Sequence, residues 1–196
     1  MSVHSSARMV VCLSGMAGCG KSTVAKKIAE KYNLRYFSGG DALKALALEM
    51  GYTPLDRGWW ESEEGMRFLS ERMQDPTFDK KVDEKLLTWA KEGNVVLDSW
   101  TMPWLLKDGF KMWLVASTEE RARRIANRDG ITFEHALSAQ KKKDARTKTI
   151  YKKLYGFTLG EDFSPFDVVL DVNCLTPEEV FQTISQVIDN LLKANE

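Results

Sequence analysis

One stretch decides the fold of this chain: Gly15-Met16-Ala17-Gly18-Cys19-Gly20-Lys21-Ser22. It matches the phosphate-binding pattern G-x-x-x-x-G-K-[ST] at every defined position. An apolar run precedes it at residues 8–14, and an amphipathic helical pattern with Val24 and Ile28 on one face follows it. A strand, a glycine loop and a helix in this order surround a polyphosphate with backbone N–H groups and a positive helix end. The stretch therefore predicts binding of a nucleoside triphosphate.

The residue types in this loop suit ATP and magnesium. Glycine lets the backbone approach phosphate oxygens without an intervening Cβ atom. Lys21 is expected to reach the β- and γ-phosphates, and the Ser22 hydroxyl is expected to ligate Mg²⁺. We therefore expect ATP and Mg²⁺ as cofactors, with ATP held by residues 15–22 and by the neighbouring Thr23.

Composition indicates one ordinary globular domain spanning residues 1–196. Lys+Arg and Asp+Glu balance at 28 each, so the net charge favours neither a nucleic acid nor a membrane as partner. Three scattered cysteines are too few for a disulfide framework or a zinc site, and they fit a reducing compartment. The N-terminus lacks the apolar core of a signal peptide, and no apolar run approaches bilayer length. We expect a cytoplasmic monomer.

Five apolar runs alternate with helical patterns along the chain. Strands are predicted at residues 8–14, 35–38, 95–98, 112–116 and 166–171. Helices are predicted after the phosphate loop, at 41–50 with Asp41 as N-cap, at 61–74, 78–92, 118–128 and 132–154, and after the N-cap Thr176. Strands with continuous apolar residues are typical of a parallel sheet that helices cover on both faces. The predicted fold is α/β, a doubly wound, five-stranded parallel sheet flanked by helices.

Ligands of such sheets bind beyond the carboxyl ends of the strands, where the phosphate loop, Ser38 and Asp98 fall. Asp98 ends an apolar strand, as does the carboxylate that holds magnesium in many phosphate-loop proteins, either directly or through water. An acidic residue that merely caps a strand end is the alternative. Together with Ser22, Asp98 is the predicted metal ligand.

Two basic clusters follow the fourth predicted strand. Arg124 and Arg128 are four residues apart and share one helix face, where they can stabilise the charge of a transferring phosphoryl group. Arg121 and Arg123 fit a solvated face that pairs with neighbouring glutamates. The second cluster, at residues 141–148, is either another solvated face or a mobile lid that folds its cations over the triphosphate.

Tryptophans stand out near the third predicted strand. Trp100 and Trp104 follow it immediately, so both are expected to face the cleft and to stack on a base or shape a pocket. Trp113 lies inside a predicted strand and is expected to pack in the core.

These pieces, in this order, resemble the archaeal-type cytidylate kinases of the nucleoside monophosphate kinase group. The likeness runs from Val10 to about Val180. It is carried by GMAGCGKSTVAKKIAEKY, SGGDALKALALEMG, DPTFDKKVDEK, VVLDSW, ERARRIANRDG, IYKKLYG and FSPFDVVLDV. The resemblance implies a P-loop kinase with a helical acceptor-binding insert at about 38–92 and a lid at about 128–156. It also implies CMP or dCMP as the acceptor.

The resemblance and the residue chemistry together define the expected site. The substrate-binding residues are expected to be Ser38, Asp41, Lys44, Asp79, Asp83, Asp98 and Trp100. The catalytic cations are expected to be Lys21, Arg124, Arg128, Lys143 and Arg146. Carboxylates such as Asp79 and Asp83 can accept from amino or hydroxyl groups, while Lys44 can hold an acceptor's phosphate.

The chain departs from this family mainly on the acceptor side. Lys44, Trp100 and Lys143 stand where the family has arginine, and a further lid arginine is replaced by Ile150. Lysine keeps the charge of arginine but lacks its bidentate fork. Arg146, one helical turn from Lys143, is the candidate substitute.

Three functions remain open from sequence. The first is ATP-dependent phosphoryl transfer to CMP or dCMP. The second is the same reaction with another nucleotide, or with a small metabolite whose hydroxyl accepts the phosphoryl group. The third is a nucleotide-binding switch or RNA-associated NTPase with little kinase activity.

Overall fold

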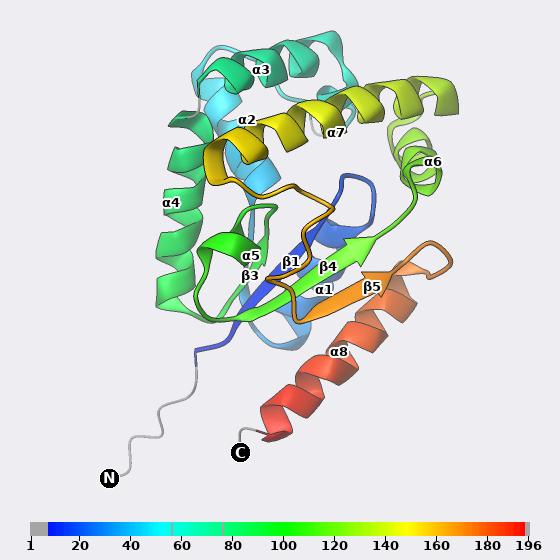
Figure 1. Cartoon of the computed structure of the whole chain (residues 1–196). Coiled ribbons are helices and arrows are strands. Elements are labelled where there is room, and N and C mark those ends of the chain that lie inside the picture. The colour runs from blue at the N-terminus through cyan, green and yellow to red at the C-terminus, as the bar shows by residue number, and fades with distance from the viewer. Residues whose placement is uncertain (1–7, 56, 76, 195–196) are drawn as a thin grey trace.

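The computed structural model describes residues 8–55, 57–75 and 77–194 (Figure 1). In this part of the chain five strands form one parallel sheet, in the order β2-β3-β1-β4-β5. The strands are β1 (Val10–Gly15), β2 (Arg35–Ser38), β3 (Val95–Asp98), β4 (Phe110–Val115) and β5 (Val168–Asp171). The central β1 has two strands on each side, so the predicted doubly wound α/β fold is confirmed.

Helices connect the strands and cover both faces of the sheet. They are α1 (Lys21–Lys31), α2 (Gly39–Glu49), α3 (Glu63–Gln74), α4 (Thr77–Glu92), α5 (Met102–Leu105), α6 (Thr118–Asp129), α7 (Phe133–Tyr155) and α8 (Pro177–Ala194), with a 3-10 turn η1 (Trp59–Glu61). Within the described ranges none of these helices is both long and apolar enough to cross a bilayer.

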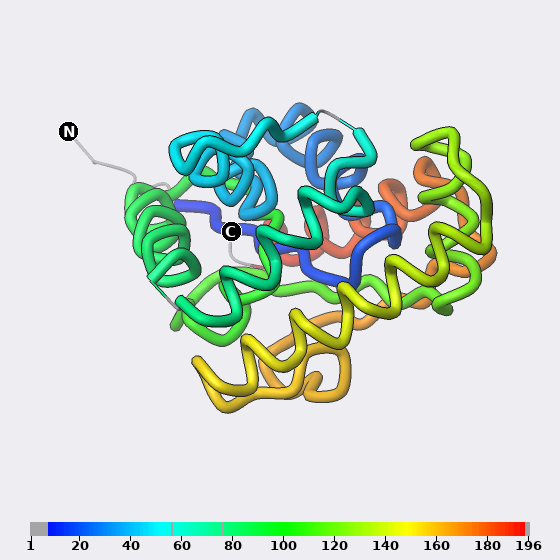
Figure 2. The backbone as a smooth tube through the Cα atoms, turned by 90° about the horizontal axis from the view of Figure 1, so that it is seen from above, coloured from blue at the N-terminus to red at the C-terminus, as the bar shows by residue number. Residues whose placement is uncertain are grey.

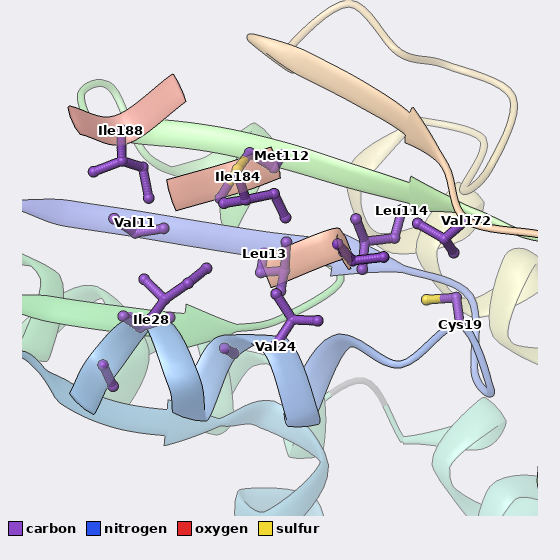
Figure 3. Packing of buried hydrophobic residues seen from close by; sticks show 14 residues of the cluster. Val11, Leu13, Cys19, Val24, Ile28, Met112, Leu114, Val172, Ile184 and Ile188 are labelled. Atoms are coloured by element: carbon purple, nitrogen blue, oxygen red, sulfur yellow. The ribbon is translucent and has the colours of Figure 1, made fainter. Parts of the chain in front are cut away.

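The main core lies between the sheet and the helices α1 and α8. Figure 3 shows Val24 and Ile28 of α1 pointing toward Leu13 of β1, with Ile184 and Ile188 of α8 beside them. All five side chains are at most 1% exposed. A fully buried aliphatic side chain contributes about 1.5–3 kcal/mol relative to an exposed one, so this layer anchors the helix that carries Lys21 and Ser22.

The opposite face packs against α4 and α5, and α3 and α7 lie at the carboxyl ends of the strands. Leu86 of α4 and Met102 of α5 are buried against Leu97 of β3. Figure 2, seen from above, shows α3 and α7 side by side across that end of the sheet. These two helices roof the region where parallel sheets bind ligands.

The phosphate loop is held closely by its neighbours, which explains two of its glycines. A Cβ atom on Gly15, whose φ is +145°, would lie 2.6 Å from the carbonyl oxygen of Leu114 in β4. A Cβ atom on Gly18, whose φ is +85°, would lie 2.8 Å from the carbonyl oxygen of Arg121 in α6. The loop thus packs between β4 and α6, and only glycine fits these two positions without strain.

Several predicted boundaries are corrected. The N-cap of α2 is Ser38, whose hydroxyl accepts from the backbone N–H of Asp41 at 3.2 Å, so Asp41 lies inside the helix. β4 begins at Phe110 and β5 at Val168, each two residues from the predicted start. The short α5 was not predicted. Pro76, where a break between helices was predicted, lies outside the described residues.

Candidate active site

A cavity of about 490 Å³ opens at the carboxyl ends of β1, β2 and β3. It is lined by most of the residues that the sequence pointed to. These are Ala17, Gly18, Gly20, Lys21, Ser22, Thr23, Ser38, Asp79, Asp83, Asp98, Trp100, Arg124, Arg128 and Lys143. The fold therefore brings the phosphate loop, the carboxylate at the end of β3, two arginines of α6 and two carboxylates of α4 to one cavity.

The phosphate loop supplies a lysine and a hydroxyl to this cavity. Lys21 Nζ donates to the carbonyl oxygen of Met16 at 3.2 Å and lies 5.8 Å from the centre of the Trp100 ring. The Ser22 hydroxyl donates to Asp98 Oδ2 at 2.5 Å. Ser22 stands in the first turn of α1, and the core packing of that helix fixes its position.

Ser22 and Asp98 fit a magnesium ion. A serine hydroxyl and a carboxylate are hard oxygen donors, and Mg²⁺ usually takes one or two carboxylates plus phosphate oxygens and water. Asp98 is buried and pairs with Ser22, while Tyr36 donates more weakly to the same Oδ2 atom at 3.3 Å. In the described part of the chain, no group of three or more histidine, cysteine, aspartate or glutamate side chains could hold a metal ion.

Lys143 of α7 lines the roof of the cavity together with Trp60, and it contacts Glu61. Its Nζ lies 4.9 Å from the centre of the Trp60 ring and 3.8 Å from Glu61 Oε1. Burial lowers the pKa of Lys143 to about 8, although the nearby Glu61 works in the other direction. Arg128 approaches the same glutamate, at 4.0 Å, and is also held by Asp129. Glu61 therefore links the two cations.

Of the four arginines of α6, Arg121 is the one whose place differs from the prediction. Arg123 is exposed and pairs with Glu120, as expected for a solvated face. Arg121 was assigned to the same face, but it is buried and donates to Ala17 O at 3.0 Å and to Asp144 at 2.8 Å. Arg121 therefore supports the phosphate loop through its hydrogen bond to Ala17. Arg124 lines the cavity, with its Nη2 donating to Val172 O at 2.6 Å.

Two buried carboxylates of α4, Asp79 and Asp83, line the cavity. Asp79 forms an ion pair with Arg72 of α3, and both side chains are at most 3% exposed. Asp83 accepts from the hydroxyls of Thr101 and Tyr155. Burial raises the pKa of Asp83 to about 6, while its hydrogen bonds with Thr101 and Tyr155 lower it. Asp83 is therefore ionised above neutral pH.

Trp100 lines the cavity and also supports the phosphate loop. Its Nε1–H donates to the carbonyl oxygen of Gly15 at 2.6 Å. Trp104, which was expected to face the cleft, instead stacks on Phe157 with ring centres 3.8 Å apart and does not line this cavity. Trp113 is 2% exposed, so its predicted place in the core is confirmed.

Six predicted site residues lie away from the cavity surface. Asp41 is exposed on α2, and Lys44 Nζ donates to the carbonyl oxygen of Leu55 at 2.8 Å. Arg146, the candidate substitute in the lid, donates to Met66 O of α3 at 2.9 Å. The loop residues Gly15, Met16 and Cys19 do not line the cavity either. Cys19 belongs to the core (Figure 3).

Other residues of the site were missed. Arg72 and Trp60, which line the cavity, and Glu61, which contacts Lys143, come from the stretch between Tyr52 and Gln74, which contains no motif. Tyr151 also lines the cavity. Its position in the IYKKLYG stretch, which resembles the family, was the one sequence feature that could have indicated a place in the site.

Known proteins are similar to this chain over most of its length. A model of the cytidylate kinase-like family matches residues 10–174. The cytidylate kinase of Methanocaldococcus jannaschii is 35% identical over 190 residues, covering 94% of this chain and 100% of the relative. The cytidylate kinase of Ignicoccus hospitalis is 36% identical over 182 residues, covering 91% and 98%. Among solved structures, the shikimate kinase of Acinetobacter baumannii in complex with shikimate has a TM-score of 0.56 at 16% identity, covering 94% of each chain. Similarity at that identity bears on the fold alone.

Proposed function

The chain belongs to the cytidylate kinase-like family, and on this basis we propose that it transfers the γ-phosphoryl group of ATP to CMP or dCMP. The single observation that carries the proposal is the common cavity. Lys21, Ser22 and Asp98 line it, and we propose that they hold ATP and Mg²⁺, while Asp79 and Asp83, which also line it, contact the acceptor. Such a cavity can hold a triphosphate and a second ligand next to each other.

In this proposal the protein accelerates transfer by aligning ATP with the acceptor and by stabilising the negative charge of the phosphates. Lys21 neutralises charge on the β- and γ-phosphates. Arg124, Arg128 and Lys143 stabilise the charge that spreads over the moving phosphoryl group. Ser22 and Asp98 hold Mg²⁺, which supplies further positive charge to the phosphates when it is bound. The phosphate of CMP is already nucleophilic, so no catalytic base is needed.

We propose that α7 and the segments beside it act as a lid at about 128–156, and that residues 38–92 form the acceptor-binding insert. Lys143 lines the cavity from α7, and Arg72 and Asp79 line it from the insert. Residues of one chain fill all of these roles, so a monomer suffices for the proposed reaction.

A transfer assay tests the proposed function. Purified protein with ATP and Mg²⁺ is expected to phosphorylate CMP and dCMP at least tenfold more efficiently, by kcat/KM, than AMP, GMP or shikimate. The measurement is formation of ADP together with the nucleoside diphosphate. Robust transfer to a hydroxyl compound, beside little or none to CMP, would contradict the proposal and favour the hydroxyl acceptor. ATP hydrolysis without any transfer would favour a switch.

The roof lysine predicts a pH dependence. Because burial lowers the pKa of Lys143 to about 8, it loses its positive charge as the pH rises through that value. We therefore expect kcat to fall above pH 8, in a range where the phosphates of ATP and CMP are already fully ionised.

Lys143→Arg should remove this alkaline decline, because arginine stays charged. The control is Lys142→Arg, on the exposed side of the same helix, which should keep the decline. An identical pH profile for wild type and Lys143→Arg would show that Lys143 does not cause the decline.

A further inference from the structure

A second cavity, of about 420 Å³, lies beside the phosphate loop and has no part in the function proposed above. Its walls include Met16 of the loop, Trp113 of β4, Arg121 of α6 and Phe163 of the segment 156–167, which connects α7 to β5. Among the residues that the structure describes, none lines both this cavity and the candidate active site. Ligand pockets typically measure about 300–1,000 Å³, so the second cavity can hold a small molecule.

Helix α7 stands between the two cavities. Lys141, Asp144 and Lys148 are three and four residues apart, so they project from one face of the helix. All three line the second cavity. Lys143 and Tyr151 line the candidate active site from another face of the same helix. A ligand in the second cavity would therefore contact the helix that we propose as the lid.

Two aromatic rings form an apolar wall in the second cavity. The ring centres of Trp113 and Phe163 are 5.8 Å apart, with an angle of 67° between the ring planes. Trp113 is 2% exposed, but Phe163 is 38% exposed, which is unusual for a phenylalanine. A flat apolar ligand that covers Phe163 removes this surface from water and can pack on the ring in an offset or edge geometry. The wall therefore favours an aromatic ligand.

The charges of the cavity favour an anion. Arg121, Lys141 and Lys148 line it together with a single carboxylate, that of Asp144. Arg121 pairs with Asp144 at 2.8 Å, and Lys148 pairs with Glu161 at 2.8 Å. Across residues 8–55, 57–75 and 77–194, the Lys141 side chain makes neither a hydrogen bond nor an ion pair. Its ammonium group can therefore bind a carboxylate, sulfonate or phosphate group of a ligand.

Two lining residues connect the second cavity to the phosphate loop. Met16 belongs to the loop, and its carbonyl oxygen accepts from Lys21 Nζ at 3.2 Å. Arg121 donates to the carbonyl oxygen of Ala17 at 3.0 Å while it pairs with Asp144 of α7. A ligand that packs on Met16 and Arg121 therefore contacts groups that hold the loop in place.

We propose that this cavity is an effector site for a small aromatic anion. The ring of the ligand covers Phe163, its acidic group pairs with Lys141, and its contacts with Met16 and Arg121 change the affinity of the phosphate loop for ATP. The inference goes beyond the proposed function. The second site does not depend on that function, and only its coupling to ATP does.

The probe for the site is 8-anilinonaphthalene-1-sulfonate (ANS), an aromatic anion whose fluorescence rises in apolar surroundings. Folded wild type is expected to bind one equivalent, and Lys141→Glu should weaken binding at least tenfold, because it replaces attraction of the sulfonate by repulsion. Lys142→Glu is the matched control: Lys142 is also exposed but does not line the cavity, and this variant should bind ANS as wild type does. Equal weakening in the two variants would mean that only the net charge matters, and would overturn the proposal.

Two further comparisons test the location of the probe and the class of ligand. Phe163→Ala should weaken ANS binding at least fivefold, whereas Lys21→Ala, in the candidate active site, should not change it. Loss of ANS binding in Lys21→Ala but not in Lys141→Glu would place the probe in the other cavity and overturn the proposal. N-phenyl-1-naphthylamine has the same rings without the sulfonate, and it should bind at least tenfold more weakly. Equal binding of the two probes would contradict a site for anions.

Calorimetry with ATP and Mg²⁺ tests the effector role. Saturating ANS is expected to change the Kd for ATP at least threefold, and ATP should change the Kd for ANS by the same factor, because coupling between two sites is reciprocal. Lys141→Glu should lose this effect at the same ANS concentration. An unchanged Kd for ATP would overturn the effector role, and so would simple competition between ANS and ATP. If wild type does not bind ATP, the proposed function and the effector role both fail, while the ANS variants still decide whether the second site exists.

Discussion

Replacing Lys21 with alanine is expected to lower kcat for phosphoryl transfer by about three orders of magnitude and to leave the fold intact. Lys21 is the first residue of α1 and lines the cavity. The matched phosphate-binding pattern contains no second lysine that could replace it. Removing one preorganised group that stabilises transition-state charge typically costs about 10²–10³-fold in kcat, and a cation on a phosphoryl group can be worth more.

The fold should survive because the Lys21 side chain is not part of the core. In the described chain its side chain makes one hydrogen bond, to Met16 O at 3.2 Å, and a hydrogen bond of this kind contributes about 0.5–1.5 kcal/mol. Steady-state kinetics gives kcat, and thermal unfolding gives the stability. Lys26→Ala, on the exposed side of the same helix, is the matched control and should retain full activity. A folded Lys21→Ala protein with wild-type kcat would contradict the assignment of the phosphate loop.

Residues close together in the sequence allowed the sheet and the donor side to be predicted. The loop pattern is local, and the apolar runs along the chain identified all five strands, with the starts of β1, β4 and β5 wrong by two residues. The N-cap of α2 was misplaced because Gly39 and Gly40 resemble a loop. In the structure the Ser38 hydroxyl satisfies a free backbone N–H group and starts the helix three residues earlier.

The contacts of Arg72 and Glu61 could not be predicted because they join segments that are distant in the sequence. Arg72 meets Tyr151, 79 residues away, and only that proximity and Asp79 make a buried arginine tolerable. Glu61 and Lys143 come together across a similar distance in sequence. Trp104 was expected in the cleft because it follows a strand, but Phe157 covers its ring. Sequence patterns within one element carry no information on such partners.

Lys44 and Trp100, where the resemblance led us to expect arginine, both contact the backbone. Lys44 donates to Leu55 O, which ties α2 to the segment that follows it. Trp100 donates to Gly15 O at the start of the phosphate loop. Both side chains therefore stabilise the walls of the site. Arg72, which pairs with Asp79, lines the same cavity in the described part of the chain.

Asp98→Asn is expected to raise the Mg²⁺ concentration needed for half-maximal activity by about 10–100-fold and to lower kcat as well. Asparagine has the same shape and can still accept from Ser22, but it lacks the negative charge that attracts the cation. Changes to groups that hold a metal ion directly or through water typically cost about 10–100-fold in affinity or activity. A Mg²⁺ titration of initial rates at saturating ATP and CMP measures the effect.

Asp41→Asn is the matched control for this variant, because Asp41 is exposed and does not line the cavity. Asp41→Asn removes one negative charge, as Asp98→Asn does, and it should keep the Mg²⁺ requirement of wild type. That result would show that the effect of Asp98→Asn does not come from the net charge of the protein. Thermal unfolding without nucleotide checks that Asp98→Asn still folds, which is a necessary check because Asp98 is buried and accepts from Ser22 and Tyr36. If Asp98→Asn lowers kcat but the Mg²⁺ requirement does not change, Asp98 acts on the phosphoryl acceptor or on the loop through Ser22. The metal would then have to be held by Ser22 and the phosphates alone.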